Sequence, residues 1–103
     1  MLSADLIYKL PESVSMEDGA MMEPLAVAVH SVYSIGQCKS NQVIVVFGAG
    51  PVGLLCMAVA KALGARRVVA VDINEERLLF AKNYAATDTY IPVSWNYVIP
   101  LTW

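Results

Sequence analysis

The feature that most limits the possible folds of this chain is a glycine-rich segment directly after a run of five apolar residues. Val43–Phe47 contains no polar residue and is rich in β-branched side chains, as expected of a strand covered on both faces of a parallel sheet. The next six residues fit the pattern G-x-G-x-x-G: Gly48, Ala49, Gly50, Pro51, Val52 and Gly53. The sequence therefore predicts a strand, a tight turn and a helix in direct succession.

The pattern of strand and helix is then repeated along the chain. Residues 52–63 are apolar and rich in alanine and precede Gly64, which predicts a helix packed on the sheet. Residues 68–71 again look like a buried strand, and Asn74 is expected to cap a further helix before a third strand opens near Thr89. The predicted fold class is α/β: a partial Rossmann fold comprising the first βαβ unit of a doubly wound parallel sheet, preceded by lead-in helices.

The residues before this unit predict short helices. Residues 2–10 are expected to form a short strand or an extended lead-in, and Ser15 with Asp18 resembles a capping box. Pro24 suits the first position of a second helix that ends at Gly36. One face of that helix is expected to carry Leu25, Val29, Val32 and Tyr33.

Three segments follow from these patterns. Residues 1–42 are interpreted as a lead-in segment, residues 43–93 as a partial dinucleotide-binding Rossmann domain, and residues 94–103 as an atypical hydrophobic tail.

The glycine segment has the residue types that binding a dinucleotide pyrophosphate requires. In this pattern Gly48 allows the tight turn, Gly50 lets the backbone approach the pyrophosphate, and Gly53 lets the helix lie close to the strand. The unpaired N–H groups and the positive dipole end of the following helix attract a diphosphate. The alternative interpretation is a glycine turn with a purely structural role.

An acidic residue at the end of the second strand favours dinucleotide binding and selects the cofactor. Asp72 lies nineteen residues after Gly53, where its carboxylate can accept hydrogen bonds from the adenosine ribose of NAD. A 2′-phosphate would be repelled by Asp72 and by the acids at positions 75 and 76, so NAD is the predicted cofactor. Arg66 and Arg67 stand at the opposite end of the strand and are expected to be solvated.

Charge and cysteine content exclude other classes of function. The net charge is −2, and the seven Lys and Arg residues form no basic stripe, so nucleic acid is not an expected partner. Cys38 and Cys56 show neither metal-ligand nor disulfide spacing, which suggests a reducing, cytoplasmic setting. The uncharged residues 43–60 raise the alternative of a membrane helix, but their central glycines and proline argue against it.

From Ala4 to about Pro92 the chain resembles the zinc-dependent medium-chain alcohol and polyol dehydrogenases, and within them the sorbitol and xylitol dehydrogenase branch that includes the D-xylulose reductases. The combination of a Glu-Pro-Leu segment with Gly-Ala-Gly-Pro-Val-Gly about 25 residues later is more specific than a glycine motif alone. The stretches that carry the resemblance are Lys9-Leu10-Pro11, Gly19-Ala20-Met21-Met22-Glu23-Pro24-Leu25-Ala26-Val27, Val46 to Leu55, and Ala60-Lys61-Ala62-Leu63-Gly64-Ala65.

This resemblance implies NAD and zinc as cofactors, a small polyol as substrate, and a homo-oligomeric enzyme. It implies that Val52 packs on the cofactor, that Asp72 binds the adenosine ribose, and that Arg77 reaches the same region. Pro51 lies within the same cofactor-binding turn. Glu23 matches a glutamate beside the catalytic zinc, although from the residues alone it is an acid at a helix start.

The chain also departs from the family pattern. Family members are considerably longer, and the Cys and His-Glu zinc ligands of the family have no counterpart here, nor do the later strands that hold nicotinamide. No residue is therefore predicted to act as the acid or base of hydride transfer, and the chain alone is expected to be inactive. Two alternatives stay open: a truncated, inactive fragment, and a dinucleotide-binding module without catalysis.

Overall fold

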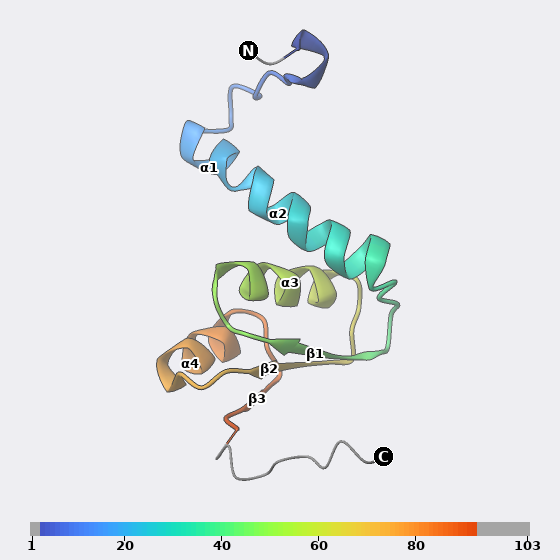
Figure 1. Cartoon of the computed structure of the whole chain (residues 1–103), viewed down its shortest axis with the longest axis vertical. Helices are drawn as coiled ribbons and strands as arrows, with labels where there is room; N and C mark the ends of the chain where they lie inside the picture. Colours follow the sequence, from blue (N-terminus) through green and yellow to red (C-terminus); the bar gives the residue numbers. More distant parts are fainter. Residues whose placement is uncertain (1–2, 93–103) are drawn as a thin grey trace.

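The computed structural model describes residues 3–92, and it arranges them as a three-stranded parallel sheet with helices on one face (Figure 1). The predicted α/β class and the partial Rossmann-like arrangement are confirmed. In chain order the elements are η1 (Ala4–Leu6), α1 (Met16–Ala20), α2 (Met22–Val29), η2 (His30–Ile35), β1 (Val43–Phe47), α3 (Pro51–Ala62), β2 (Arg67–Val71), α4 (Glu75–Tyr84) and β3 (Asp88–Tyr90). The division into three segments stays a prediction, and the tail 94–103 lies outside the described residues.

The sheet has the order β1-β2-β3, and both pairs of neighbouring strands are parallel. Val43 pairs with Arg67, and Val69 pairs with Asp88. Helix α3 connects β1 to β2, and α4 connects β2 to β3; the two helices contact each other and both contact β2. Two successive crossovers in one direction place both helices on the same face of the sheet, with α2 packed against the outer side of α3 (Figure 1).

The core lies between the sheet and these two helices. More than half of its buried residues are alanine, which lets the helices approach the strands closely. The buried residues of the helices and strands are Met57 and Ala60 of α3, Val68 and Ala70 of β2, and Leu78 and Ala81 of α4.

The opposite face of the sheet has no covering element among residues 3–92, so strands that are patterned for burial on both faces leave one apolar face without a partner in this part of the chain. Along β1, Ile44 and Val46 pack against the core, whereas Val43, Val45 and Phe47 are 44%, 47% and 82% exposed. The uncovered face holds a shallow apolar hollow of about 620 Å³, lined chiefly by Val45, Phe47, Val69, Val71 and Tyr90. The uniform apolar pattern of the strand suits two covered faces, and among residues 3–92 a single layer of helices covers one of them.

The lead-in segment begins differently from the prediction. A short 3-10 helix occupies Ala4–Leu6, so the start of the lead-in is neither a strand nor extended; Ile7 has extended backbone, and no helix or strand is assigned to residues 7–11. The capping box before α1 is confirmed: the Asp18 N–H donates to the Ser15 hydroxyl oxygen at 3.0 Å, and the Ser15 N–H donates to the Asp18 carboxylate at 3.4 Å. Each polar side chain satisfies an N–H group that a helix start leaves without a partner.

The second helix begins earlier than predicted, and its buried side includes only part of the predicted face. It starts at Met22, which places Pro24 at the third position; there the missing N–H costs no helical hydrogen bond. Ala28 is fully buried and Val32 packs on the core, whereas Val29 and Tyr33 are exposed. The small Ala28 side chain allows α2 to approach α3 closely, and this packing selects the buried face.

The same helix ends in a π-helical segment, η2, with Gly36 as its C-cap as predicted, but the left-handed residue is the next one. Gly36 follows η2 with an ordinary φ of −73°, and Gln37 adopts the left-handed conformation with φ +49°. A Cβ atom at Gly36 would lie 2.9 Å from the Ser31 carbonyl oxygen. Glycine is therefore required here for a close approach of backbone, not for a left-handed turn.

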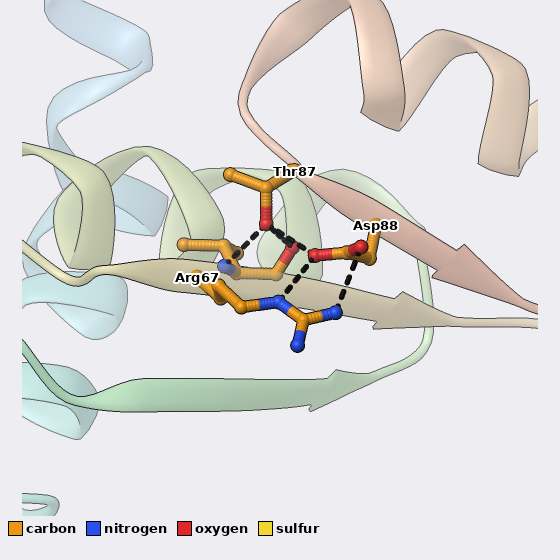
Figure 2. A network of polar contacts seen from close by, with 4 residues as sticks. Arg67, Thr87 and Asp88 are labelled. Carbon is orange, nitrogen blue, oxygen red and sulfur yellow. Dashed lines mark hydrogen bonds and ion pairs between the residues drawn. The ribbon is translucent and has the colours of Figure 1, made fainter.

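A polar network joins β3 to the amino end of β2 (Figure 2). The guanidinium of Arg67 contacts both carboxylate oxygens of Asp88, with Nε at 3.0 Å and Nη2 at 2.9 Å. Arg67, followed by the Thr87 hydroxyl, lowers the pKa of Asp88 from 3.8 to about 2. Arg67 was expected to be solvated; it is exposed, but it is also paired across the sheet, while Arg66 is exposed as predicted.

Replacing Thr87 with valine is expected to destabilise the fold by about 1–2 kcal/mol, because it removes a hydroxyl that bonds a partly buried backbone group. The Thr87 hydroxyl oxygen accepts the Val68 N–H at 2.9 Å and lies 2.7 Å from the Asp88 carboxylate, to which it can donate. Urea unfolding followed by circular dichroism measures the change. Thr87→Ser retains the hydroxyl and serves as the control; equal losses in both variants would contradict the role of the hydroxyl.

Among the described residues, no helix combines the length and the apolar character needed to cross a membrane. The uncharged run at residues 43–60 is divided between β1, the glycine turn and α3.

Candidate functional site

The glycine turn connects the end of β1 to the start of α3 and is bonded to the end of β2. Gly48 has φ +100°, a conformation that side-chain-bearing residues rarely adopt, and its N–H donates to the Val71 carbonyl oxygen at 2.7 Å. Because β1 and β2 are parallel, the turn and the residues after β2 meet at the same edge of the sheet. This is the carboxyl edge, where open α/β sheets bind their ligands.

Gly53 is required by the close approach of α3 to the turn. A Cβ atom at this position would lie 1.9 Å from the Gly48 carbonyl oxygen and 3.0 Å from its carbonyl carbon. Neither backbone atom can move away without displacing the turn itself. The structure therefore supports the packing role predicted for this glycine.

Gly50 stands at the opposite, open side of the turn. It precedes the first residue of α3 with extended backbone, and a Cβ atom placed on it meets no atom within 4 Å. Pro51 occupies the first helical position, where its missing N–H costs nothing, and Val52 is 47% exposed. The space beside Gly50 thus fits a group that approaches the backbone and the amino end of α3.

Asp72 follows β2 and reaches back to the glycine turn. Its Oδ2 atom accepts the Ala49 N–H at 2.8 Å, and its Oδ1 atom accepts the Asn74 N–H at 2.8 Å. These bonds, the one from Ala49 first, lower the pKa of Asp72 below its ordinary value of 3.8, and the positive charge of Arg77 adds to the effect. Asp72 is therefore ionised at neutral pH and can accept further hydrogen bonds from a ligand.

Asn74 and Arg77 connect this carboxylate to α4. The Asn74 side chain accepts the Arg77 N–H at 3.1 Å and caps the helix, as predicted. Arg77 lies in the first turn of α4, close enough for its charge to act on Asp72. One edge of the sheet thus brings together Gly48, Gly50, Pro51, Val52, Gly53, Asp72 and Arg77.

Glu23 is separate from this group of residues. It is an exposed residue in the first turn of α2, where its charge is favourable for the helix dipole. Within residues 3–92, no group of three or more His, Cys, Asp or Glu side chains is arranged to hold a metal ion. The described residues by themselves therefore do not fit a zinc ion.

The hydrogen bond between Asp72 and Ala49 was not anticipated from the sequence. The two residues are 23 positions apart, and alanine carries no functional side chain. The signal available in the sequence was the G-x-G-x-x-G pattern followed by an acid after the next strand. That pattern indicates a common ligand but does not indicate a direct bond between the two segments.

A model of the zinc-binding dehydrogenase family matches residues 51–98. D-xylulose reductase A of Aspergillus niger is 61% identical over 92 residues, which make up 89% of this chain and 25% of that protein. This chain therefore spans about a quarter of the length of the curated relatives it matches.

Solved structures of dehydrogenases have a fold similar to that of this chain. The short chain alcohol dehydrogenase of Escherichia coli in complex with NADH is 32% identical, with a TM-score of 0.83 over 91% of this chain and 28% of that one. A putative zinc-binding dehydrogenase of Sinorhizobium meliloti bound to NADP is 28% identical, with a TM-score of 0.77 over 82% of this chain and 25% of that one. By sequence and by fold, the chain belongs to the zinc-binding dehydrogenase family.

Proposed function

We propose that this chain is the NAD-binding portion of a zinc-dependent polyol dehydrogenase of the xylitol and sorbitol type, which oxidises a polyol to a ketose by hydride transfer to NAD. One observation carries the proposal: the glycine turn and the Asp72 carboxylate are in contact at the carboxyl edge of the sheet. The Ala49 N–H donates to Asp72 Oδ2 at 2.8 Å. The two segments offer complementary groups for the two halves of an adenosine diphosphate.

The pyrophosphate is assigned to the glycine turn and the amino end of α3. The open space at Gly50 allows phosphate oxygens to approach the backbone, and the first N–H groups of the helix have no partner within it. Val52 is exposed on the first turn of α3 and is proposed to pack on the cofactor. When bound, the dinucleotide supplies the hydride acceptor; the residues of this chain bind and orient its adenosine half.

The ribose is assigned to Asp72, with Arg77 beside it. Each carboxylate oxygen of Asp72 already accepts one backbone N–H and retains capacity to accept a ribose hydroxyl. A phosphate on the 2′-hydroxyl would meet the charge of Asp72, with Glu75 and Glu76 in the next turn. This arrangement supports NAD over NADP, although one of the similar structures holds NADP.

Asp72→Ala is expected to weaken NADH binding by roughly ten- to hundredfold, because a charged acceptor of ribose hydroxyl hydrogen bonds is lost, at a cost of about 1.5–3 kcal/mol. Isothermal titration of the purified chain with NADH and with NADPH measures both the affinity and the preference. Leu79→Ala, on an exposed position of α4, is the control. Equal affinity of the unmodified chain for the two cofactors would contradict the proposal.

The polyol substrate is supported by the names of the relatives, which include D-xylulose reductases. Glu23 is proposed to stand beside a catalytic zinc whose ligands come from outside residues 3–92, and this assignment rests on the family resemblance alone. The free thiols of Cys38 and Cys56 agree with a reducing, cytoplasmic setting. A homo-oligomeric enzyme is likewise proposed from the resemblance.

A further inference from the structure

We propose that Asp72 is a positioning residue for the pyrophosphate as well as a ligand of the ribose, because its carboxylate holds the glycine turn in shape through the Ala49 N–H. This inference rests on the proposed function and deepens it. The pyrophosphate site and the ribose site then both depend on one side chain. A substitution at Asp72 is therefore expected to weaken binding of the pyrophosphate, which Asp72 does not contact.

Hydrogen bonds, more than packing, define the turn on its open side. Cβ atoms placed on Gly48 and Gly50 meet no atom within 4 Å, so no neighbouring group presses on either residue from the direction of a side chain. Two successive N–H groups bond this segment to the end of β2: Gly48 to the Val71 carbonyl oxygen at 2.7 Å, and Ala49 to Asp72 at 2.8 Å. Of these two bonds, only the one from Ala49 to Asp72 is made to a side chain.

The carboxylate is itself held in place. Its other oxygen accepts the Asn74 N–H, and Asn74 in turn caps α4 through Arg77. Asp72 therefore joins three segments: the glycine turn, the end of β2 and the start of α4. An asparagine amide at this position has the same size but presents an NH2 group where one carboxylate oxygen stands, so in this geometry it accepts only one of the two N–H groups, whereas alanine accepts neither.

The sign of the change in affinity distinguishes a positioning role of Asp72 from the effect of its negative charge. A negative charge near a diphosphate opposes its binding, so on charge alone the loss of Asp72 strengthens binding of a nucleotide that has no ribose hydroxyls. Loss of a positioning residue has the opposite sign, because the N–H groups of the turn are no longer held for the phosphate oxygens. The direction of the change therefore identifies its cause.

The test compares ADP with 2′,3′-dideoxy-ADP, which retains the diphosphate but offers no ribose hydroxyl to Asp72. Affinities are measured by isothermal titration for the full 103-residue chain and for Asp72→Ala, which removes both acceptor oxygens. We expect Asp72→Ala to weaken dideoxy-ADP by about fivefold, the loss of one hydrogen bond of ordinary strength, and ADP by more than that. Glu75→Gln, which removes a nearby charge without touching the turn, is expected to leave dideoxy-ADP binding equal or slightly tighter.

A second measurement does not need a ligand. Amide hydrogen exchange at Ala49 is expected to accelerate about fivefold in Asp72→Ala and to stay unchanged in Glu75→Gln. Unchanged exchange at Ala49 in Asp72→Ala, or binding of dideoxy-ADP by this variant as tight as by the unmodified chain, would overturn the positioning role. Failure of the unmodified chain to bind ADP is a different result: it would overturn the proposed function, and the pyrophosphate role with it.

Discussion

Gly53→Ala is expected to lower the free energy of unfolding by at least about 2 kcal/mol and to abolish NADH binding, because the added methyl has no space. Its carbon atom would lie 1.9 Å from the Gly48 carbonyl oxygen, so α3 must move away from β1 or the turn must change shape. The higher helix propensity of alanine, worth about 1 kcal/mol, does not offset such a contact. Thermal or urea unfolding followed by circular dichroism, together with an NADH titration, measures the two effects.

The matched control is the same substitution three residues earlier. Gly50→Ala adds its methyl in open space and on an ordinary backbone conformation, with φ −78°. We expect it to change stability by less than about 1 kcal/mol, the cost of alanine before the first residue of a helix, yet to reduce NADH affinity severalfold or more. Similar destabilisation by the two substitutions would contradict this geometry; unaltered NADH affinity in Gly50→Ala would contradict the place assigned to the pyrophosphate.

The purified chain is expected to self-associate through the uncovered face of the sheet, and Phe47→Glu is expected to weaken this association by about ten- to hundredfold. Phe47 is 82% exposed on an apolar face that also carries Val45, Val69, Val71 and Tyr90. Burying a phenylalanine side chain contributes about 1.5–3 kcal/mol, and an apolar patch of this kind is a typical site of association. The open edges of β1 and β3 within the described sheet provide further sites for pairing.

Light scattering at several protein concentrations measures the association. The control is Leu79→Glu, which makes the same change of charge at a residue of α4 that is 66% exposed. It is expected to leave the association largely unaffected, since α4 lies on the helical side of the sheet. A monodisperse species of 11.2 kDa for the unmodified chain would refute the prediction.

Local sequence patterns were sufficient to predict the elements that carry the site. Three of these patterns act only on residues nearby in the chain. They are the β-branched run before the glycine turn, Pro51 at the first position of α3, and Asn74 before α4. Their effects on backbone conformation do not depend on distant contacts. For the same reason the strand, the turn and the acid after the second strand were predicted at the positions where they lie.

The packing of α2 was outside the reach of these patterns, and the exposure of one face of β1 depends on the number of layers present, not on the pattern of the strand. The apolar residues of α2 surround much of its circumference, so periodicity alone does not distinguish the face of Ala28 from the face of Val29. Contact with α3 determines which of the two faces is buried. Equally, an apolar strand indicates that two faces are suited to burial, but the number of layers present decides whether both are buried.

The sequence by itself determined a dinucleotide-type glycine turn, the strands that flank it and an acid at the end of the second strand, because each is specified by residues close together in the chain. Only the tertiary structure decided that Asp72 bonds to Ala49 and that Arg67 pairs with Asp88. These contacts join residues 23 and 21 positions apart. Their formation depends on the register of the parallel strands, which brings the ends of different segments to one edge of the sheet.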